Sequence, residues 1–418
     1  MPNSTSFGLK TCIFLTLSYP FDLGKEETFL AAEVNSFSSF FDTTVVIPSA
    51  VGGKLVELPD NCVLDLRYAT ENKRLAKKHK LVLILKGLTL RSYYIELLRS
   101  LNNNFSIKTC VDLAILIGRI KCQSKVLGNI ISKLPNQDIV CYTFWFRNET
   151  SALAQIPKRN FKLITRAHGA DVYIERSKLN LYYREQTLAN LDKVFCVSEA
   201  GKRYLQDQFP KYKDKFVTRY LGSVPHDFKS EHSDESNTIR FVSCSSVIGL
   251  KRVDLIFEFL STLANLKSQY RIVWNHIGDG ELMDSLKQMT ESKPENIEVH
   301  FHGHKENRLI LEFYRDNKID LFIHLSSTEG LPVVIMEALS FGIPVIATDV
   351  GGVSEIVNSK TGYLLSQNPS FEEVLEKVND YLALSPDQTK NMRSAIRHFW
   401  LDKLNAETNA RSHISSFK

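Results

Sequence analysis

The sequence lacks any cysteine pattern that would build a disulfide framework or a zinc ribbon. Its seven cysteines are odd in number, scattered along the chain, and include no C-x-x-C pair. Such a set is typical of proteins from a reducing compartment. We therefore expect a protein whose fold does not depend on disulfides.

Long hydrophobic runs are also missing. The first apolar run, residues 12–17, is too short for a signal peptide or a membrane span, and no later run approaches 18 residues. The first run is better interpreted as a strand. We predict a cytoplasmic protein, and this prediction leaves open a peripheral attachment to the inner face of a membrane.

The length and composition indicate an ordinary globular protein with more than one core. A chain of 418 residues with 43% hydrophobic and 24% charged residues is expected to form about two domains. We expect no cofactor.

Charge is distributed unevenly, although the net charge is only +5. Thirteen Lys and Arg residues lie between Lys73 and Lys133, with few acids among them. They are interpreted either as solvated helix faces or as a surface attracted to anionic lipid head groups or a pyrophosphate-linked acceptor. Nucleic acid is not an expected partner, because no recognition motif or interleaved aromatic residues accompany the charge.

The first half of the chain has the pattern of a doubly wound α/β sheet. Residues 11–18 and 43–48 are predicted strands, and residues 25–41 between them have apolar side chains at helical spacing. Gly24 is the only glycine of the first loop, so no dinucleotide fingerprint is present. Gly24 is kept as a minor candidate for ligand contact.

A histidine stands at the end of a later predicted strand in the first half. Residues 161–166 are apolar enough for a buried strand, and they lead into the sequence RAHGADVY. His168 is therefore expected at the carboxyl edge of the sheet, where Gly169 lets a ligand approach the backbone. The alternative is an ordinary core or surface histidine.

The second half repeats the α/β pattern after a polar segment. Residues 222–238 are the best linker candidate, and residues 239–243 begin a second sheet. Lys251 and Arg252 stand beside a helix start, where two cations suit a doubly charged ligand. Gly278 opens a G-D-G-E turn after the strand predicted for residues 271–277.

Residues 320–355 hold the most informative stretch of the sequence. A buried strand at 321–325 is followed by a polar turn, a helix that begins near Pro332, and a second strand at 345–347. The helix is apolar except for Glu337, and Glu329 stands just before it. A buried carboxylate costs several kcal/mol unless it is hydrogen-bonded, so Glu337 predicts a polyhydroxyl ligand.

His300, His302 and His304 alternate and suggest a metal site at first sight. Gly303 indicates that the strand has already ended, and no acidic or thiol ligand lies nearby in the sequence. We predict no metal site.

Several of these stretches together resemble the retaining glycosyltransferases of family 4, which have the GT-B fold. The specific part is EGLPVVIME, the E-x7-E signature formed by Glu329 and Glu337, inside a frame from Asp320 to GIPVIATDVGGVSEIV. Lys251, the GDGE turn, the HGH sequence at His302 and RAHGADVY extend the resemblance over nearly the whole chain.

The resemblance implies an α/β fold of two Rossmann-like domains that face each other across a cleft. The implied boundaries are an acceptor-binding domain at 1–221, a linker at 222–238, a nucleotide-sugar-binding domain at 239–386, and a C-terminal helix at 387–418 that returns to the first domain.

The resemblance also implies roles for individual residues. Glu337 would accept hydrogen bonds from the ribose of a UDP- or GDP-linked sugar, and Glu329 would contact the transferred sugar. Lys251 would neutralise the diphosphate, with His168 as a further catalytic residue. The remaining donor-binding residues would be Gly330, Leu331, Val333, Arg252, Gly278, His304 and Gly24.

The implied activity is transfer of a hexose with retention to a lipid-linked glycan in surface polysaccharide biosynthesis, for example of lipopolysaccharide or capsule, without a metal, since the chain has no Asp-x-Asp. Ser246 departs from the family pattern, which usually has Arg there. Either Arg252 compensates, or the diphosphate is held more loosely. The alternatives are a nucleotide-sugar epimerase of the same fold and a non-catalytic nucleotide-sugar-binding protein.

Overall fold

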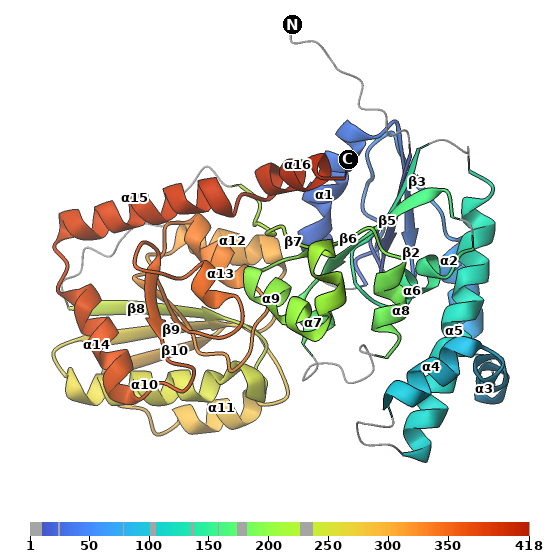
Figure 1. Cartoon of the computed structure of the whole chain (residues 1–418). Helices are drawn as coiled ribbons and strands as arrows, with labels where there is room; N and C mark the ends of the chain where they lie inside the picture. The colour runs from blue at the N-terminus through green and yellow to red at the C-terminus, as the bar shows by residue number, and fades with distance from the viewer. Residues whose placement is uncertain are drawn as a thin grey trace, which may run out of the picture. The chain divides into compact units, whose positions relative to one another are not determined.

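The computed structural model describes residues 11–23, 26–77, 79–100, 106–134, 138–157, 159–173, 182–225 and 237–417. These residues form two compact units. Unit 1 consists of Met1–Arg219 together with Ala410–Lys418, and unit 2 consists of Tyr220–Asn409. Each unit is built on its own parallel sheet (Figure 1).

Unit 1 contains a seven-stranded parallel sheet in the order β3-β2-β1-β4-β5-β6-β7. Its strands are β1 (Thr11–Thr16), β2 (Thr43–Pro48), β3 (Cys62–Leu64), β4 (Ile139–Thr143), β5 (Phe161–Ala167), β6 (Lys193–Cys196) and β7 (Phe216–Thr218). Its helices are α1 (Glu27–Phe40), α2 (Arg67–Ala76), α3 (Lys80–Leu88), α4 (Arg91–Ser100), α5 (Ile107–Ile131), α6 (Asn148–Ala154), α7 (Gly169–Val172), α8 (Arg184–Ala189), α9 (Glu199–Gln208) and the 3-10 helix η3 (Pro210–Lys215).

Unit 2 contains a six-stranded parallel sheet in the order β10-β9-β8-β11-β12-β13. Its strands are β8 (Thr238–Cys244), β9 (Arg271–Ile277), β10 (Ile297–Phe301), β11 (Leu321–His324), β12 (Val345–Thr348) and β13 (Gly362–Leu365). Its helices are α10 (Val253–Leu266), α11 (Met283–Thr290), α12 (Asn307–Asp316), α13 (Val333–Ser340), α14 (Phe371–Leu382), α15 (Pro386–Lys403) and the 3-10 helices η4 (Gly249–Lys251) and η5 (Val353–Glu355).

Both sheets have the topology of a Rossmann-like, doubly wound fold, so the predicted α/β class is confirmed. In each sheet the strand order reverses beside the first strand of the unit, between β1 and β4 in unit 1 and between β8 and β11 in unit 2. Ligands of such sheets bind where the order reverses, outside the carboxyl ends of the strands. The topology therefore points to the loops after β8 and β11, and to those after β1 and β4.

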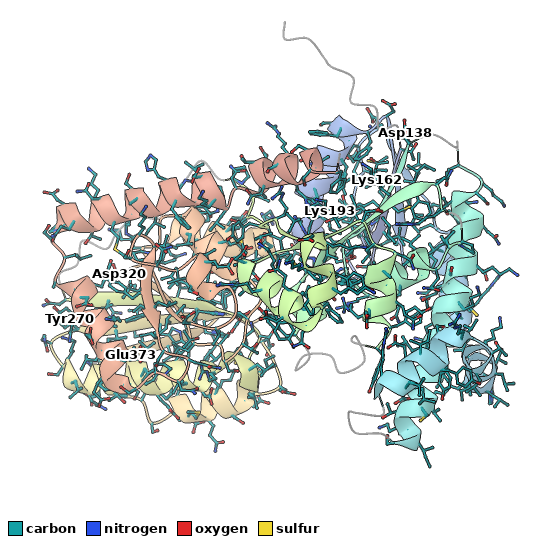
Figure 2. All side chains as sticks on the ribbon, in the orientation of Figure 1. Asp138, Lys162, Lys193, Tyr270, Asp320 and Glu373 are labelled. Carbon is teal, nitrogen blue, oxygen red and sulfur yellow. The ribbon has the colours of Figure 1, made fainter. Side chains whose placement is uncertain are left out.

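The central strands are buried because both faces of each sheet are covered. β1, β4, β11 and β12 consist entirely of buried residues, as expected for parallel strands with helices on both sides. Asp320, at the amino end of β11 (Figure 2), accepts a hydrogen bond at 2.8 Å from the backbone N–H of Arg240 in β8. Asp320 thus links two central strands at the end opposite to the candidate site.

The C-terminal segment is shared between the two units. The sequence predicted that residues 387–418 as a whole return to the first domain, but α15 packs against α13 of unit 2, where Arg397 donates to the carbonyl of Ser340. Only Ala410–Lys418 belong to unit 1, in which His413 and Phe417 pack against Tyr142 and Phe195. The predicted linker at 222–238 lies mostly outside the described residues.

No helix in the described part of the chain has the length and apolar character needed to cross a bilayer.

Candidate active site in unit 2

Lys251 and Glu329 meet where the strand order of unit 2 reverses. Lys251 ends η4 in the loop after β8, and Glu329 lies in the loop after β11. The Lys251 ammonium donates to the Oε1 atom of Glu329. The sequence placed both residues in the site, and the structure brings them together although 77 residues separate them.

His324 is a third member of this group, and it was not predicted from the sequence. Its Nε2 atom lies 2.8 Å from Glu329 Oε1 and 2.9 Å from the hydroxyl of Ser326. Because a carboxylate oxygen only accepts, Nε2 carries a hydrogen toward Glu329. The period-two spacing of His324 and Ser326 at a strand end was the available signal.

Glu329 is held as an ionised carboxylate. It is only 7% exposed, and burial alone would raise its pKa. The hydrogen bond and charge of His324 and the charge of Lys251 outweigh burial and keep the pKa well below its ordinary value. The site therefore contains a fixed negative charge between two nitrogen donors at neutral pH.

Glu337 is in a different state from Glu329. It is 3% exposed inside α13 and accepts one hydrogen bond, at 2.6 Å, from the side-chain amide of Asn307 at the start of α12. Burial raises the pKa of Glu337 to about 7, and the bond from Asn307 offsets only part of the rise. The carboxyl group is therefore partly protonated at neutral pH, and an added donor would favour its ionised form.

The segment between the two glutamates presents backbone donors. Gly330 and Leu331 are buried and precede α13, whose N-cap is Pro332 and whose first residue is Val333. The first N–H groups of a helix have no partner within it and carry its positive dipole end. This segment is braced by Gly352, which donates to the carbonyl of Gly330 at 2.8 Å.

Gly351 permits this bracing because its backbone passes very close to Glu329. Its φ is 59°, a left-handed conformation, and an added Cβ would lie 1.9 Å from the Glu329 carbonyl oxygen. Only glycine fits here without displacing the loop that carries Glu329.

Arg252 connects three loops of unit 2. Its guanidinium donates to the carbonyls of Leu325 at 2.5 Å, Ser326 at 3.1 Å and Gln367 at 2.8 Å, and to Asn368 Oδ1 at 3.1 Å. These bonds occupy four of its five N–H groups. Its role as a donor-binding residue stays a prediction, and its contacts show that it positions the loop after β11.

Two neighbouring turns flank the group formed by Lys251, Glu329 and His324. The N–H of Gly278 donates to the carbonyl of Gly303 at 2.9 Å, which joins the loops after β9 and β10. His304 follows Gly303 and is exposed, whereas His302 binds Asn275 Oδ1 at 2.8 Å. Among the described residues, no group of three or more His, Cys, Asp or Glu is arranged to hold a metal ion.

His168 belongs to unit 1, at the carboxyl end of β5, as the sequence predicted. Its Nε2 atom donates to the Phe144 carbonyl at 2.9 Å, and its ring packs on those of Phe144 and Trp145. Burial, followed by the charge of Arg166, lowers the pKa of His168 to about 3. The ring is therefore neutral at physiological pH. Gly24 lies outside the described residues.

A carboxylate occupies the corresponding position of unit 1. Glu26, at the N-cap of α1, accepts hydrogen bonds from the backbone N–H groups of Leu17 at 3.1 Å, Ser18 at 2.6 Å and Tyr19 at 3.0 Å. The indole N–H of Trp145, after β4, also donates to it. Where the strand order reverses in unit 1, the backbone donors are thus satisfied by the protein itself.

The two Rossmann-like units define the GT-B fold, and solved structures of glycosyltransferases share it. The lipopolysaccharide outer core galactosyltransferase WaaB superposes with a TM-score of 0.66 at 12% identity, over 98% of this chain and 100% of that one. HepE of Anabaena, solved in complex with UDP, superposes with a TM-score of 0.64 at 15% identity, over 98% and 99% of the two chains. At these identities the likeness shows the fold alone.

Sequence comparison relates unit 2 to a known family model. Residues 226–399 match the model described as glycosyl transferases group 1, so this part of the chain is similar to those proteins. The chain is also similar to the O-antigen biosynthesis glycosyltransferase WbnH of Escherichia coli, at 28% identity over 224 residues, which are 53% of this chain and 61% of WbnH. The alignment thus spans about three fifths of that relative's length.

Proposed function

We propose that the protein is a retaining glycosyltransferase of family 4 that moves a hexose from a nucleotide sugar to a glycan acceptor. One observation carries the proposal. Lys251 and the ionised Glu329 contact each other where the strand order of unit 2 reverses, within the segment that matches the group 1 glycosyltransferases.

The donor would be bound through complementary charge and hydrogen bonding. The ribose hydroxyls would donate to Glu337, whose side chain has one hydrogen-bond donor, Asn307, among the described residues. The diphosphate would lie between the Lys251 ammonium and the N–H groups of Gly330, Leu331 and Val333. Charge-assisted contacts of this kind contribute about 1.5–3 kcal/mol each, so together they can hold a diphosphate.

The proposed reaction breaks the bond between the anomeric carbon and the diphosphate oxygen. The acceptor hydroxyl attacks that carbon from the same face, and its proton passes to the departing diphosphate oxygen. Lys251 would stabilise the charge that develops on this oxygen. Glu329 would contact the sugar while Lys251 and His324 hold its carboxylate in place. We propose that these groups act without a metal ion or other cofactor.

The acceptor is proposed to be a lipid-linked saccharide of surface polysaccharide biosynthesis, presented at the cytoplasmic face of the inner membrane. The support is the similarity of the chain to WbnH, whose name describes O-antigen biosynthesis. The roles of Gly278, His304 and His168 toward donor or acceptor stay predictions.

A donor screen tests the proposal. UDP-, GDP- and ADP-sugars are compared by thermal shift, and the stabilising donor is then incubated with the protein in the presence of EDTA, with and without lipid-linked glycans. We expect nucleotide release that depends on the acceptor. Conversion of the donor sugar without any acceptor would indicate an epimerase, and binding without turnover for every acceptor would indicate a non-catalytic binding protein.

His324 gives a test of the charge on Glu329. In His324→Ala the buried carboxylate loses a donor, so its pKa rises. Glu329 then protonates at a higher pH than in the wild type, and we expect the acid side of the activity profile to shift upward, with activity at neutral pH reduced about tenfold. His324→Gln retains an N–H donor, so it should partly restore both the position of the acid limb and the activity at neutral pH. An unchanged acid limb in His324→Ala would contradict the positioning role.

A further inference from the structure

An apolar helical face in unit 1 has no partner within the described residues that pack around it. On α3, Leu81, Val82, Leu85 and Leu88 are exposed, with Leu81 and Leu85 more than half accessible, at 55% and 57%. Their spacing places them on one side of the helix. We call these four residues the α3 apolar face.

The opposite side of α3 is fixed tightly to α5. An added Cβ on Gly87 would lie 2.1 Å from the Ala114 carbonyl oxygen, and one on Gly118 would lie 2.0 Å from that of Leu83. The two helices therefore meet backbone to backbone, and Leu83 is buried in this contact. Because α3 is held in this way, the α3 apolar face is an outward surface of a packed helix.

Further apolar side chains are exposed nearby in the sequence. Of nineteen exposed large hydrophobic residues among those described, eight lie between Leu81 and Val111, on α3, α4 and the first turns of α5. Figure 1 shows α3 and α4 beside the same end of α5, and both helices pack against α5. Exposed apolar residues gathered on neighbouring helices are typical of an interaction site.

The charge around this face is strongly positive. Between Lys73 and Lys133 the sequence has thirteen Lys and Arg residues and two acids, in a chain with a net charge of only +5. Of the two acids, Glu96 is buried and paired with Arg99 at 2.8 Å. Lys73 on α2, Lys77 just after α2, and Lys80 and Lys86 on α3 are exposed. Outside residues 73–133 the acids outnumber the Lys and Arg residues, so the excess of positive charge lies in the same part of the sequence as the α3 apolar face.

We propose that the α3 apolar face docks unit 1 on an anionic lipid bilayer, with its leucines and valine in the interface and the surrounding lysines on the head groups. Exposed apolar residues flanked by lysines are the pattern of an interfacial helix, and an anionic surface complements the charge. The proposal goes beyond the glycosyl transfer proposed above, because it concerns a surface on unit 1 and does not depend on the site in unit 2.

Vesicle sedimentation tests the docking with the full-length protein. Vesicles of phosphatidylcholine with about 30% phosphatidylglycerol are compared with pure phosphatidylcholine, because the anionic lipid supplies the surface potential. We expect binding to the anionic vesicles, weakened about tenfold or more by Leu81→Ser/Leu85→Ser, which removes apolar surface from the interface. Neutralising Lys73, Lys77 and Lys80 to Gln should weaken it roughly 100-fold at low salt.

Matched controls come from unit 2. Leu266 and Leu401 are exposed leucines, and Lys287, Lys360 and Lys390 are exposed lysines, so Leu266→Ser/Leu401→Ser and the three Lys→Gln changes should leave vesicle binding unchanged. Equal binding by all variants would overturn the proposal. The proposal would also be overturned if the wild type did not bind vesicles but formed a concentration-dependent dimer that Leu81→Ser/Leu85→Ser abolished. The α3 apolar face would then bind a second copy of the chain. Donor binding in solution, measured by thermal shift without vesicles, should be unaffected in every variant, which separates this test from that of the proposed function.

Discussion

Replacement of Lys251 by Ala is expected to lower kcat/KM for sugar transfer by about 10²–10³, the usual effect of removing one preorganised group that stabilises developing charge. Lys251 is the side-chain cation that touches Glu329, and in the proposed reaction it faces the departing diphosphate. Most of the loss should appear in kcat, because the negative charge on the leaving oxygen grows as the bond to the sugar breaks.

The matched control is Lys287→Ala, which removes an exposed lysine from α11 and should leave kcat/KM within a factor of about two, as surface changes usually do. Nucleotide release is measured with the donor identified in the screen. Lys251→Ala should also raise the pKa of Glu329, because one of its cations is lost. Activity of Lys251→Ala equal to that of the control would rule out Lys251 as the phosphate-facing cation.

Donor affinity is expected to increase about tenfold between pH 6 and pH 8 through Glu337, because a group with a pKa of about 7 changes from mostly protonated to mostly ionised over this interval. Ribose hydroxyls donate to the ionised carboxylate, so ligand binding and ionisation favour each other. Isothermal titration calorimetry at several pH values measures the slope. Glu337→Gln should bind more weakly and lose the part of the slope that Glu337 contributes.

The diphosphate of a nucleotide sugar is esterified at both ends and stays ionised over this interval, so Glu337→Gln reports the contribution of any other titrating group of the protein alone. A slope that is equal in the wild type and in Glu337→Gln would show that Glu337 does not contact the donor.

The stability of the ligand-free protein should have the opposite dependence on pH. The pKa of Glu337 is raised from its ordinary value of 4.5 to about 7 in the folded protein. Its protonated form therefore favours the folded state below pH 4.5, and this contribution is lost as the pH rises through 7. Between pH 5.5 and pH 8 the free energy of unfolding should fall by about 2 kcal/mol more in the wild type than in Glu337→Gln.

Much of the fold could be predicted because parallel strands have a strong sequence signal. The strands predicted near 321–325 and 345–347 consist mainly of apolar residues and are buried strands in the structure. The pattern could not predict how the C-terminal helices divide between the two units. The pattern of an amphipathic helix shows that one side is buried, but it does not show which surface covers that side. For α15 this surface is α13.

The residues of the candidate site could be predicted only in part from the sequence, for a similar reason. Glu337 stood out because a charge inside an apolar helix is conspicuous, and Lys251 and Glu329 stood out because each lies beside a helix start. Asn307 and His324 did not stand out, because each becomes significant only through a partner that the fold brings to it, Glu337 and Glu329 respectively. Arg252 shows the converse, since a cation beside a helix start suggested a ligand, whereas its guanidinium binds backbone carbonyls.

Glu26 affects whether unit 1 can bind an anion at the place where its strand order reverses. Its carboxylate satisfies three backbone N–H groups and the Trp145 indole at the place in unit 1 where a doubly wound sheet would receive an anion. A tethered anion has a permanently high local concentration, so a phosphate from solution would have to displace it and leave a buried charge behind. At this position of unit 1 the protein's own carboxylate therefore competes with any anion from solution.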